Sequence, residues 1–473
     1  MKKKLFMNGE WIEASHYVQL SSPYSGKEIA EIPAATVEEV DMGLEAAFNA
    51  RKTMAVMPSH QRAQILEKVV FLLEKRADEA AEIIATEAAK PISAAKAEVA
   101  RTIQTYKFAA EEAKRIHGET IPLDAAPGGE GRLAYTVREP IGVIVAITPF
   151  NFPMNLVAHK VGPAIASGNT VILKPAGQTP LSAFFIAELF QEAGLPAGAL
   201  NVVTGSGSVI GEKLVKDDRV QKISFTGSPA VGIGIRNKAG LKRVTLELGS
   251  NSAVIIDKGI DVDKIIARCV AGAFGFQGQV CISLQRVYIL EELYEVFVEK
   301  FVEATKALKV GDPLDPKTDV SALITRNDVQ RALDWIKEAE RQGAKVACGG
   351  TSEGNVLMPT VLLEADPSLK VSCQEVFAPI VLINKVKSVE EAIELVNDSR
   401  YGLQAGIYTD NIHLALTAAQ DLHVGGVMIN DIPTFRVDHM PYGGVKESGV
   451  GREGIKYAIE EMTEQKLVVF NRN

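Results

Sequence analysis

The chain has 473 residues, of which 47% are hydrophobic and 23% charged, and its formal net charge is −8 at pH 7. This length exceeds what one hydrophobic core serves, so we expect two or three domains of an ordinary soluble protein. The acidic balance argues against nucleic acid as the main partner, because binding to phosphate backbones requires a basic surface.

The N-terminal sequence MKKKLFMNGEW starts basic, but Asn8 and Gly9 interrupt its apolar run. A secretory signal peptide needs a longer apolar region, and no other apolar run has the length of a membrane span. We therefore expect a cytoplasmic protein with no membrane partner. In that reducing compartment the four cysteines should be free thiols, and no cysteine or histidine spacing indicates a metal site.

The N-terminal part of the chain predicts a short hairpin-like start followed by long helices. Residues 60–90 place apolar side chains at helical spacing, Pro91 ends this pattern, and residues 93–116 resume it. We expect these helices to pack on a core.

From residue 140 onward, short runs rich in Val and Ile alternate with helical segments. We expect strands within residues 141–148, 170–174, 200–203 and 221–226, with a helix such as 181–194 between neighbours. Strands separated by single helices predict a parallel sheet with helices on both faces, hence an α/β fold. Ligands of such sheets bind at the carboxyl ends of the strands.

A second α/β block runs from residue 251 to about residue 440, with long helices near 291–308 and 326–342. Two short strand-like segments, 132–139 and 465–471, have no obvious partner in their own neighbourhoods. Both are candidates for oligomerisation strands.

Two glycine-rich stretches join a strand to a helix in the first sheet. They are TGSGSVIG at 204–211 and FTGSPAVG at 225–232, where Pro229 suits the first helical position. Free N–H groups at such helix starts attract a pyrophosphate. A single glycine motif also fits a plain turn, but two in one sheet favour a dinucleotide.

Lys174 ends a predicted strand just before Pro175 and is suited to hold ribose hydroxyls or a 2′-phosphate. The alternative is a solvated loop lysine. Gly177, three residues on, leaves no acidic side chain to bond a 2′-hydroxyl or to repel a 2′-phosphate.

Three further residues have a chemical and a structural interpretation. Strand alternation in VTLELG places Glu247 toward either solvent or a cleft. Asn151, in TPFNFP, is either a turn-stabilising residue or a strand-end ligand. Cys281, in FGFQGQVCIS, is either an inert buried thiol or a nucleophile displayed by a glycine turn.

Eight motifs occur in order along essentially the whole chain and together resemble the aldehyde dehydrogenase superfamily. They are TPFNFP (148–153), LKPAGQTP (173–180), FTGS (225–228), LELG (246–249), GQVC (278–281), QEVFAP (374–379), YGLQAGIYT (401–409) and PYGGVKESGVGRE (441–453). The resemblance implies that Cys281 is the nucleophile, that Glu247 is the general base and that Asn151 stabilises an oxyanion together with the Cys281 backbone N–H.

The same resemblance implies binding of NADP or NAD, without a metal. Gly177 stands where NAD-preferring members often carry Glu, so we expect use of NADP or of both cofactors. The residues expected to form the cofactor site are Thr148, Pro149, Phe150, Lys174, Pro175, Ala176, Gly177, Gly207, Gly211, Phe225, Thr226, Gly227, Ser228, Val231, Leu248, Glu375 and Phe377.

The family architecture implies a Rossmann-type cofactor domain, an α/β catalytic domain and a small β element for assembly into a homodimer or homotetramer. We expect the cofactor domain at 1–117 and 140–248, the catalytic domain at 249–442, and the oligomerisation element at 118–139 and 443–473.

The expected reaction is oxidation of a small hydroxylated or anionic aldehyde, of the lactaldehyde, sulfolactaldehyde or succinate-semialdehyde type, through a thiohemiacetal and a thioester. Arg101, Arg436 and His439 are candidates for the substrate tunnel, with surface salt bridges as the alternative. Val280 stands where the glyceraldehyde-3-phosphate branch commonly has Arg, which disfavours that substrate. A coenzyme A-acylating enzyme and a non-catalytic nucleotide-binding member are the alternatives.

The chain departs from common family patterns at three places. Ser250 and Asn251 replace the end of ELGGK, Phe276 stands where Asn is usual, and EAAKP at 87–91 replaces ESGKP. None of these departures removes an expected catalytic group.

Overall fold

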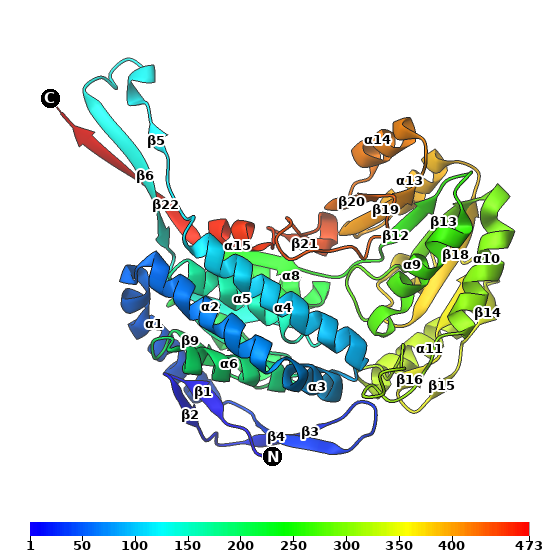
Figure 1. The fold of residues 1–473 in the computed structure, drawn as a ribbon, viewed down its shortest axis with the longest axis horizontal. Coiled ribbons are helices and arrows are strands. Elements are labelled where there is room, and N and C mark those ends of the chain that lie inside the picture. The colour runs from blue at the N-terminus through cyan, green and yellow to red at the C-terminus, as the bar shows by residue number, and fades with distance from the viewer. Residues whose placement is uncertain (473) are drawn as a thin grey trace.

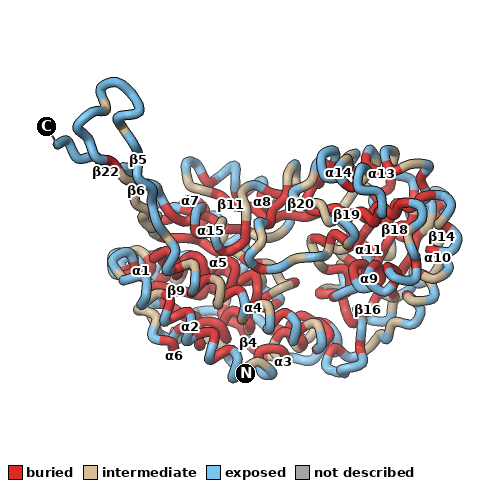
Figure 2. Tube along the Cα trace, turned by 45° about the horizontal axis from the view of Figure 1, so that its top comes forward, coloured by how far each residue is buried: buried red, intermediate tan, exposed pale blue. Residues whose placement is uncertain are grey.

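The computed structural model describes residues 1–472; residue 473, the last of the expected range 443–473, lies outside the described part. Two large sheets form the cores of two lobes, and a narrow arm projects from the first lobe (Figure 1). In the burial view the sheets and their inner helices are buried, whereas the arm is largely exposed (Figure 2).

The first sheet has the strand order β2-β1-β9-β8-β7-β10-β11-β21. Its five central strands are parallel, as expected, and the other three are antiparallel to their neighbours. The bounds are β1 Leu5–Met7, β2 Glu10–Ile12, β7 Val143–Ile147, β8 Thr170–Lys174, β9 Leu200–Val202, β10 Val220–Thr226, β11 Arg243–Glu247 and β21 Gly449–Val450.

Helices cover both faces of this sheet because successive side chains of a strand point to opposite faces. In β7, Ile144 and Ala146 enter the core shared with α2 to α6 and α15, whereas Val143 and Val145 enter the core shared with α1, α7 and α8. The bounds are α1 Val37–Val56, α2 Ser59–Lys75, α3 Ala77–Ala88, α4 Ile92–Ala113, α5 Asn155–Ala166, α6 Leu181–Ala193, α7 Gly207–Lys216, α8 Pro229–Lys238 and α15 Ile455–Glu461.

The helical region 60–90 is two helices rather than one. Arg76 leaves helical geometry (φ −112°, ψ 25°) between α2 and α3, and its guanidinium pairs with Glu79 and Glu188. The pair with Glu188 joins this break to α6, and helical periodicity alone did not reveal such a tertiary contact.

The second sheet has the order β14-β17-β18-β13-β12-β19-β20, parallel except at β14. Helices α9 to α11 contribute to cores that differ from the core of α13 and α14. The bounds are β12 Ala253–Ile256, β13 Arg286–Leu290, β14 Lys345–Cys348, β17 Thr360–Leu363, β18 Ile380–Val386, β19 Gln404–Tyr408, β20 Gly426–Ile429, α9 Val262–Phe274, α10 Glu291–Lys306, α11 Arg326–Arg341, α12 Lys370–Cys373, α13 Val389–Asn397 and α14 Ile412–Asp421.

The arm consists of β5 (Thr120–Ile121), β6 (Arg132–Pro140) and β22 (Thr463–Asn471). The two segments without a local partner in the sequence pair with each other, antiparallel, from Thr463 opposite Pro140 to Asn471 opposite Arg132. β21 and α15, which fall within the range expected for the oligomerisation element, instead contact the first sheet and its helices.

Two hairpins lie outside the large sheets: β3 (Tyr17–Ser21) with β4 (Glu28–Pro33), and β15 (Ser352–Glu353) with β16 (Val356–Leu357). No helix within residues 1–472 combines the length and apolar character needed to cross a membrane. The described residues also include no group of His, Cys, Asp and Glu arranged to hold a metal ion.

Candidate active site

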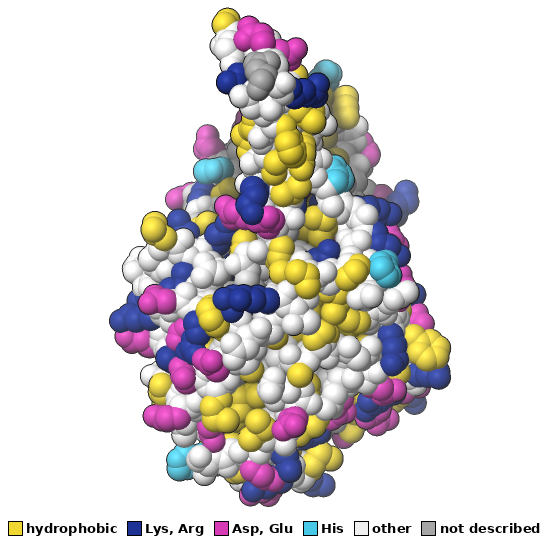
Figure 3. Space-filling model, turned by 90° about the vertical axis from the view of Figure 1, so that its left-hand side faces the viewer, with side chains coloured by type: hydrophobic (Ala, Val, Ile, Leu, Met, Phe, Trp, Pro, Cys, Tyr) yellow, Lys and Arg dark blue, Asp and Glu magenta, His cyan; other side chains and the backbone are white. Residues whose placement is uncertain are grey.

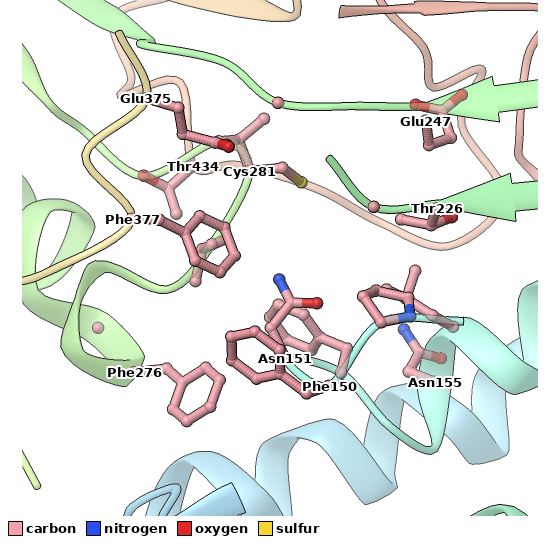
Figure 4. A pocket seen from close by; sticks show the side chains of 18 of the residues that line it. Phe150, Asn151, Asn155, Thr226, Glu247, Phe276, Cys281, Glu375, Phe377 and Thr434 are labelled. Atoms are coloured by element: carbon pink, nitrogen blue, oxygen red, sulfur yellow. The ribbon is translucent and has the colours of Figure 1, made fainter. Parts of the chain in front are cut away.

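A cavity of about 660 Å³ is lined by residues of both lobes. Glu247 reaches it from the end of β11 and Asn151 from the loop after β7, whereas Cys281, Glu375 and Phe377 reach it from loops of the second lobe (Figure 4). The cavity therefore brings together the three side chains expected to carry the chemistry.

A left-handed turn displays Cys281 to this cavity. Phe276, Gln277 and Gly278 have φ values of 47°, 56° and 68°, a region that favours glycine. Gly278 is required, because a Cβ there would lie 2.2 Å from the Ala378 carbonyl oxygen. The thiol is half-buried, in contrast to Cys269, which is fully enclosed in a core.

The surroundings of Cys281 keep its thiol protonated. Burial raises its pKa to about 11, while the Tyr442 hydroxyl, 2.9 Å from Sγ, and the nearby Arg436 guanidinium oppose this rise. Glu375 and Glu247 add to it. Because the thiolate is the nucleophile, the thiol must lose its proton before it attacks.

The Asn151 amide lies beside the nucleophile. Its Nδ2 donates one hydrogen bond to the Gln279 carbonyl (3.0 Å), which leaves a second N–H for the cavity. The Cys281 backbone N–H donates no hydrogen bond to the described residues. Both groups therefore keep a donor that the expected oxyanion role requires.

A buried ion pair, which the sequence did not reveal, holds the Asn151 loop. Lys90 Nζ binds Glu98 and also donates to the Asn151 carbonyl (2.6 Å). Glu98 Oε1 accepts from the backbone N–H groups of Met154 and Asn155, where α5 begins. Both side chains are at most 1% exposed, so this pair fixes the loop that carries the amide.

Phe276, the residue that departs from the usual Asn, completes this cluster. Lys90 Nζ lies 4.3 Å from the centre of its ring and 3.8 Å from that of Phe152. A cation over aromatic faces is electrostatically stabilised. The departure at 276 thus has a structural role next to the nucleophile turn.

The other departures also make defined contacts. The Ser250 N–H donates to Glu375 Oε1 (3.0 Å), and Asn251 Nδ2 donates to the Ser372 carbonyl (2.9 Å). Both residues therefore support the loop that carries Glu375.

Glu247 ends β11 with its carboxyl group 3% exposed, and neither oxygen has a hydrogen-bond partner in the described residues. Burial raises its pKa well above the usual value, and Glu453 raises it further, while Arg436 and Lys160 oppose the rise. A carboxyl group whose pKa is raised in this way suits a general base at neutral pH.

Behind Glu247 lies a network of buried charges. Glu453 pairs with Lys160 (2.8 Å) and with Arg436 (3.1 Å). Asp438 pairs with Arg101 (2.7 Å) and His159 (2.9 Å). Burial by itself raises the pKa of Asp438, but His159 and Arg101 hold this pKa below its usual value.

Two of the three substrate candidates line the cavity, Arg101 and Arg436. His439 does not: it is exposed and its ring packs 4.7 Å from that of Phe108. In the segment 435–439, Arg436 and Asp438 are directed inward and the residues beside them are exposed. This alternation sends His439 to the surface, so we leave it out of the substrate site.

The strand ends of the first sheet offer a cradle for a dinucleotide. Lys174 is 8% exposed, burial lowers its pKa, and no ion pair or side-chain hydrogen bond joins it to the described residues. Ser228 begins α8 without a side-chain cap, which leaves the first N–H groups of that helix free. The buried hydroxyls of Thr148 and Thr226 are likewise unpartnered. These groups fit NAD(P).

On the other side of the cavity, Glu375 is half-buried, and the loss of solvent around its carboxyl group raises its pKa to about 7. The Phe377 ring stands edge-on to Phe150. The expected cofactor residues that line the cavity are Pro149, Phe150, Thr226, Gly227, Ser228, Leu248, Glu375 and Phe377. Those that lie outside it, at or after the ends of β7, β8 and β10 or in α7 and α8, are Thr148, Lys174, Pro175, Ala176, Gly177, Gly207, Gly211, Phe225 and Val231.

A thiol and a carboxyl group facing one cavity beside a dinucleotide cradle are the groups expected of a cofactor-dependent dehydrogenase with a cysteine nucleophile. The model of the aldehyde dehydrogenase family matches residues 11–468. The chain therefore belongs to the aldehyde dehydrogenase family and is an oxidoreductase that acts on aldehydes with NAD(P).

Relatives resemble the chain over its whole length. A 3-sulfolactaldehyde dehydrogenase of Priestia aryabhattai is 47% identical over 467 residues, covering 99% of this chain and 98% of the relative. Aldehyde dehydrogenase 21 of Physcomitrella patens, solved with its reaction product succinate, superposes with a TM-score of 0.98 at 39% identity, covering 100% and 98%. The NADP-dependent glyceraldehyde-3-phosphate dehydrogenase of Bacillus halodurans, solved with NADP, gives 0.98 at 37% identity, covering 100% of both chains.

We predict that Lys90→Met lowers the free energy of unfolding by about 3–5 kcal/mol, because it leaves the buried Glu98 charge without its cationic partner. It should also lower kcat, since the Asn151 loop loses its anchor. Urea unfolding and steady-state kinetics measure both effects. Lys96→Met, which removes an exposed lysine of α4, is the control, and parental stability of Lys90→Met would contradict the prediction.

Proposed function

We propose that this enzyme oxidises a small hydroxylated or anionic aldehyde to the carboxylic acid, with Cys281 as nucleophile, Glu247 as base and Asn151 as oxyanion donor. The observation that carries the proposal is the convergence of these three groups on one cavity beside the cofactor cradle. The names of the similar enzymes support the class of substrate.

In the first step the Cys281 thiolate bonds to the aldehyde carbon and the carbonyl oxygen becomes an oxyanion. The free Asn151 N–H and the Cys281 backbone N–H donate hydrogen bonds to this oxygen. Each such donor contributes about 3 kcal/mol to stabilisation of the transition state in other oxyanion holes.

The cofactor, held by the cradle around Lys174 and Ser228 and by Glu375, supplies a hydride acceptor when it is bound. Glu247 then takes a proton from the water that attacks the acyl carbon on Cys281, and the carbon–sulfur bond breaks so that Cys281 leaves as the thiolate. Its unpartnered oxygens are available for that water. The presence of a carboxyl group here supports hydrolysis over transfer to coenzyme A.

We predict that Cys281→Ala lowers kcat about 10⁴-fold or more, because the covalent step is lost, with cofactor affinity nearly unchanged. Glu247→Gln should release about one equivalent of reduced cofactor and then stall at the acyl-enzyme. Stopped-flow absorbance measures both, with Cys373→Ala, a thiol outside the cavity, as control. Steady parental turnover of Glu247→Gln would remove it as the base, and a strict requirement for coenzyme A would assign the acylating reaction instead.

For the substrate, we infer an acidic or hydroxylated group bound by Arg101 and Arg436. Each guanidinium already pairs with a carboxylate, but Arg436 Nε is buried and has no hydrogen-bond partner among residues 1–472. A guanidinium with an unused donor suits a carboxylate or sulfonate.

We predict that Arg101→Met raises KM about tenfold for succinate semialdehyde or sulfolactaldehyde. A hydrogen bond to a charged group contributes about 1.5–3 kcal/mol, and Arg101 already uses part of its guanidinium to bind Asp438. KM for an uncharged aldehyde such as propanal should change little. Arg115→Met, an exposed arginine outside the cavity, is the control. An equal rise for charged and uncharged aldehydes would exclude Arg101 as an anion-binding residue.

For the cofactor, we infer that NADP is accepted at least as well as NAD, because no acidic side chain stands at position 177 and Lys174 has no ion-pair partner among the described residues. A Cβ at Gly177 would meet nothing within 4 Å, so a side chain fits there.

Gly177→Glu should therefore raise KM for NADP about tenfold or more, since like charges near a protein surface repel by a few kcal/mol. Gly177→Gln, of the same size without the charge, separates repulsion from crowding. Initial rates with each cofactor decide the matter, and an equal effect of both substitutions would contradict the electrostatic explanation.

We further infer a cytoplasmic homodimer or homotetramer, with the cofactor and catalytic domains near the expected boundaries and the arm as the assembly element. Apolar side chains lie exposed along the arm: Leu133, Leu467, Val469 and Phe470. Figure 3 shows apolar atoms gathered on this projection. A patch of this kind on a protruding sheet favours contact with another copy.

A further inference from the structure

The Tyr442 hydroxyl lies 2.9 Å from Cys281 Sγ. The side chain is 3% exposed and packs with Ile282 and Leu403 around the nucleophile. No other hydrogen bond reaches this sulfur from the described residues, so the phenol is its one hydrogen-bonding neighbour within that part of the chain.

Tyr442 is held from several sides. Its backbone N–H donates to the Glu453 carbonyl (3.0 Å) and its carbonyl accepts from the Glu453 N–H (2.7 Å). The Arg436 guanidinium carbon lies 3.6 Å from the centre of its ring. The hydroxyl is therefore fixed before any substrate binds.

The direction of the hydrogen bond follows from the ionisation of both partners. Burial and the neighbouring Cys281 raise the pKa of Tyr442 well above its usual value, although Arg436 opposes the rise. The phenol therefore keeps its proton and can donate it. A thiolate has no proton and only accepts, and hydrogen bonds to charged acceptors are stronger than those between neutral groups.

We propose that Tyr442 is a catalytic residue whose hydroxyl donates to the Cys281 sulfur as the thiol proton leaves to water. The attacking thiolate then forms at lower pH than its burial alone permits. When the sulfur bonds to the aldehyde carbon, the negative charge moves to the carbonyl oxygen and this hydrogen bond weakens. The inference rests on the proposed role of Cys281 as nucleophile.

The other charged groups facing the pair do not replace this donor. Arg436 favours the thiolate through its charge, but it donates no hydrogen bond to the sulfur among the described residues and it is paired with Glu453. Glu247 and Glu375 disfavour the thiolate.

The test is the rate at which iodoacetamide alkylates Cys281 between pH 6 and 10, without aldehyde or cofactor, read by peptide mass. Tyr442→Phe should raise the thiol pKa by about one to two units, the size expected for a hydrogen bond to a charged group. Because nucleophilicity rises with pKa at roughly half that slope, alkylation at fixed pH should slow about 3- to 10-fold. Tyr106→Phe, which removes a buried and unpartnered phenol oxygen elsewhere, should leave the rate unchanged.

Replacement of Tyr442 by 3-fluorotyrosine is a second test, which keeps the ring in place. Its more acidic phenol is a stronger donor, so alkylation below the thiol pKa should quicken relative to the parent. A merely structural role for Tyr442 would not produce this opposite shift. If Tyr442→Phe does not fold, the fluorinated protein alone decides.

Parental or faster alkylation in folded Tyr442→Phe, or slower alkylation with 3-fluorotyrosine, would overturn the inference. Either result would leave the role of Cys281 untouched, because that role is tested separately by turnover of Cys281→Ala. Conversely, turnover in Cys281→Ala would refute the proposed function whatever the alkylation rates are.

Discussion

The hydrogen bond from the Asn151 amide to the Gln279 carbonyl joins the two lobes beside the nucleophile. Asn151 belongs to the loop between β7 and α5 of the first lobe, and Gln279 belongs to the turn that carries Cys281. Each partner is fixed in its own lobe: Lys90 holds the Asn151 carbonyl, and Gln279 Oε1 accepts from the Ile324 N–H. The distance between the sulfur and the oxyanion donor is therefore set by buried polar contacts. A displacement of either loop would break these hydrogen bonds, and a buried polar group without a partner costs free energy.

The buried groups around the cavity have pKa values that are shifted in opposite directions. Cys281 and Glu247 both have raised pKa values, whereas Lys160 and Arg436 hold the pKa of Glu453 low despite its burial. Neighbouring carboxyl groups with pKa values pushed apart divide their roles, one remaining charged and one free to exchange protons. The raised pKa of Cys281 also keeps the thiol protonated before an aldehyde binds.

The sequence was informative wherever a pattern is local. Buried parallel strands appear as apolar runs, so the strands around Ile144 and Ile172 were found, and collinear motifs located Cys281, Glu247 and Asn151. Contacts between distant segments left no such trace. The pairing of β6 with β22 and the bond from Lys90 to Asn151 depend on tertiary packing, and Tyr442 lay in a recognised motif without any local sign that its hydroxyl meets a sulfur.

The C-terminal segment passes through all parts of the molecule in turn. Tyr442 contacts the nucleophile, β21 then adds to the first sheet, α15 packs on α4 and α5, and β22 continues directly into the arm. A single stretch of chain thus runs from the residue beside the reactive sulfur to the arm, and most of it is helix or strand. Only residues 443–462 separate the phenol beside the sulfur from Thr463, the first residue of the arm strand β22, so the reaction centre and the proposed assembly surface are close neighbours along the chain.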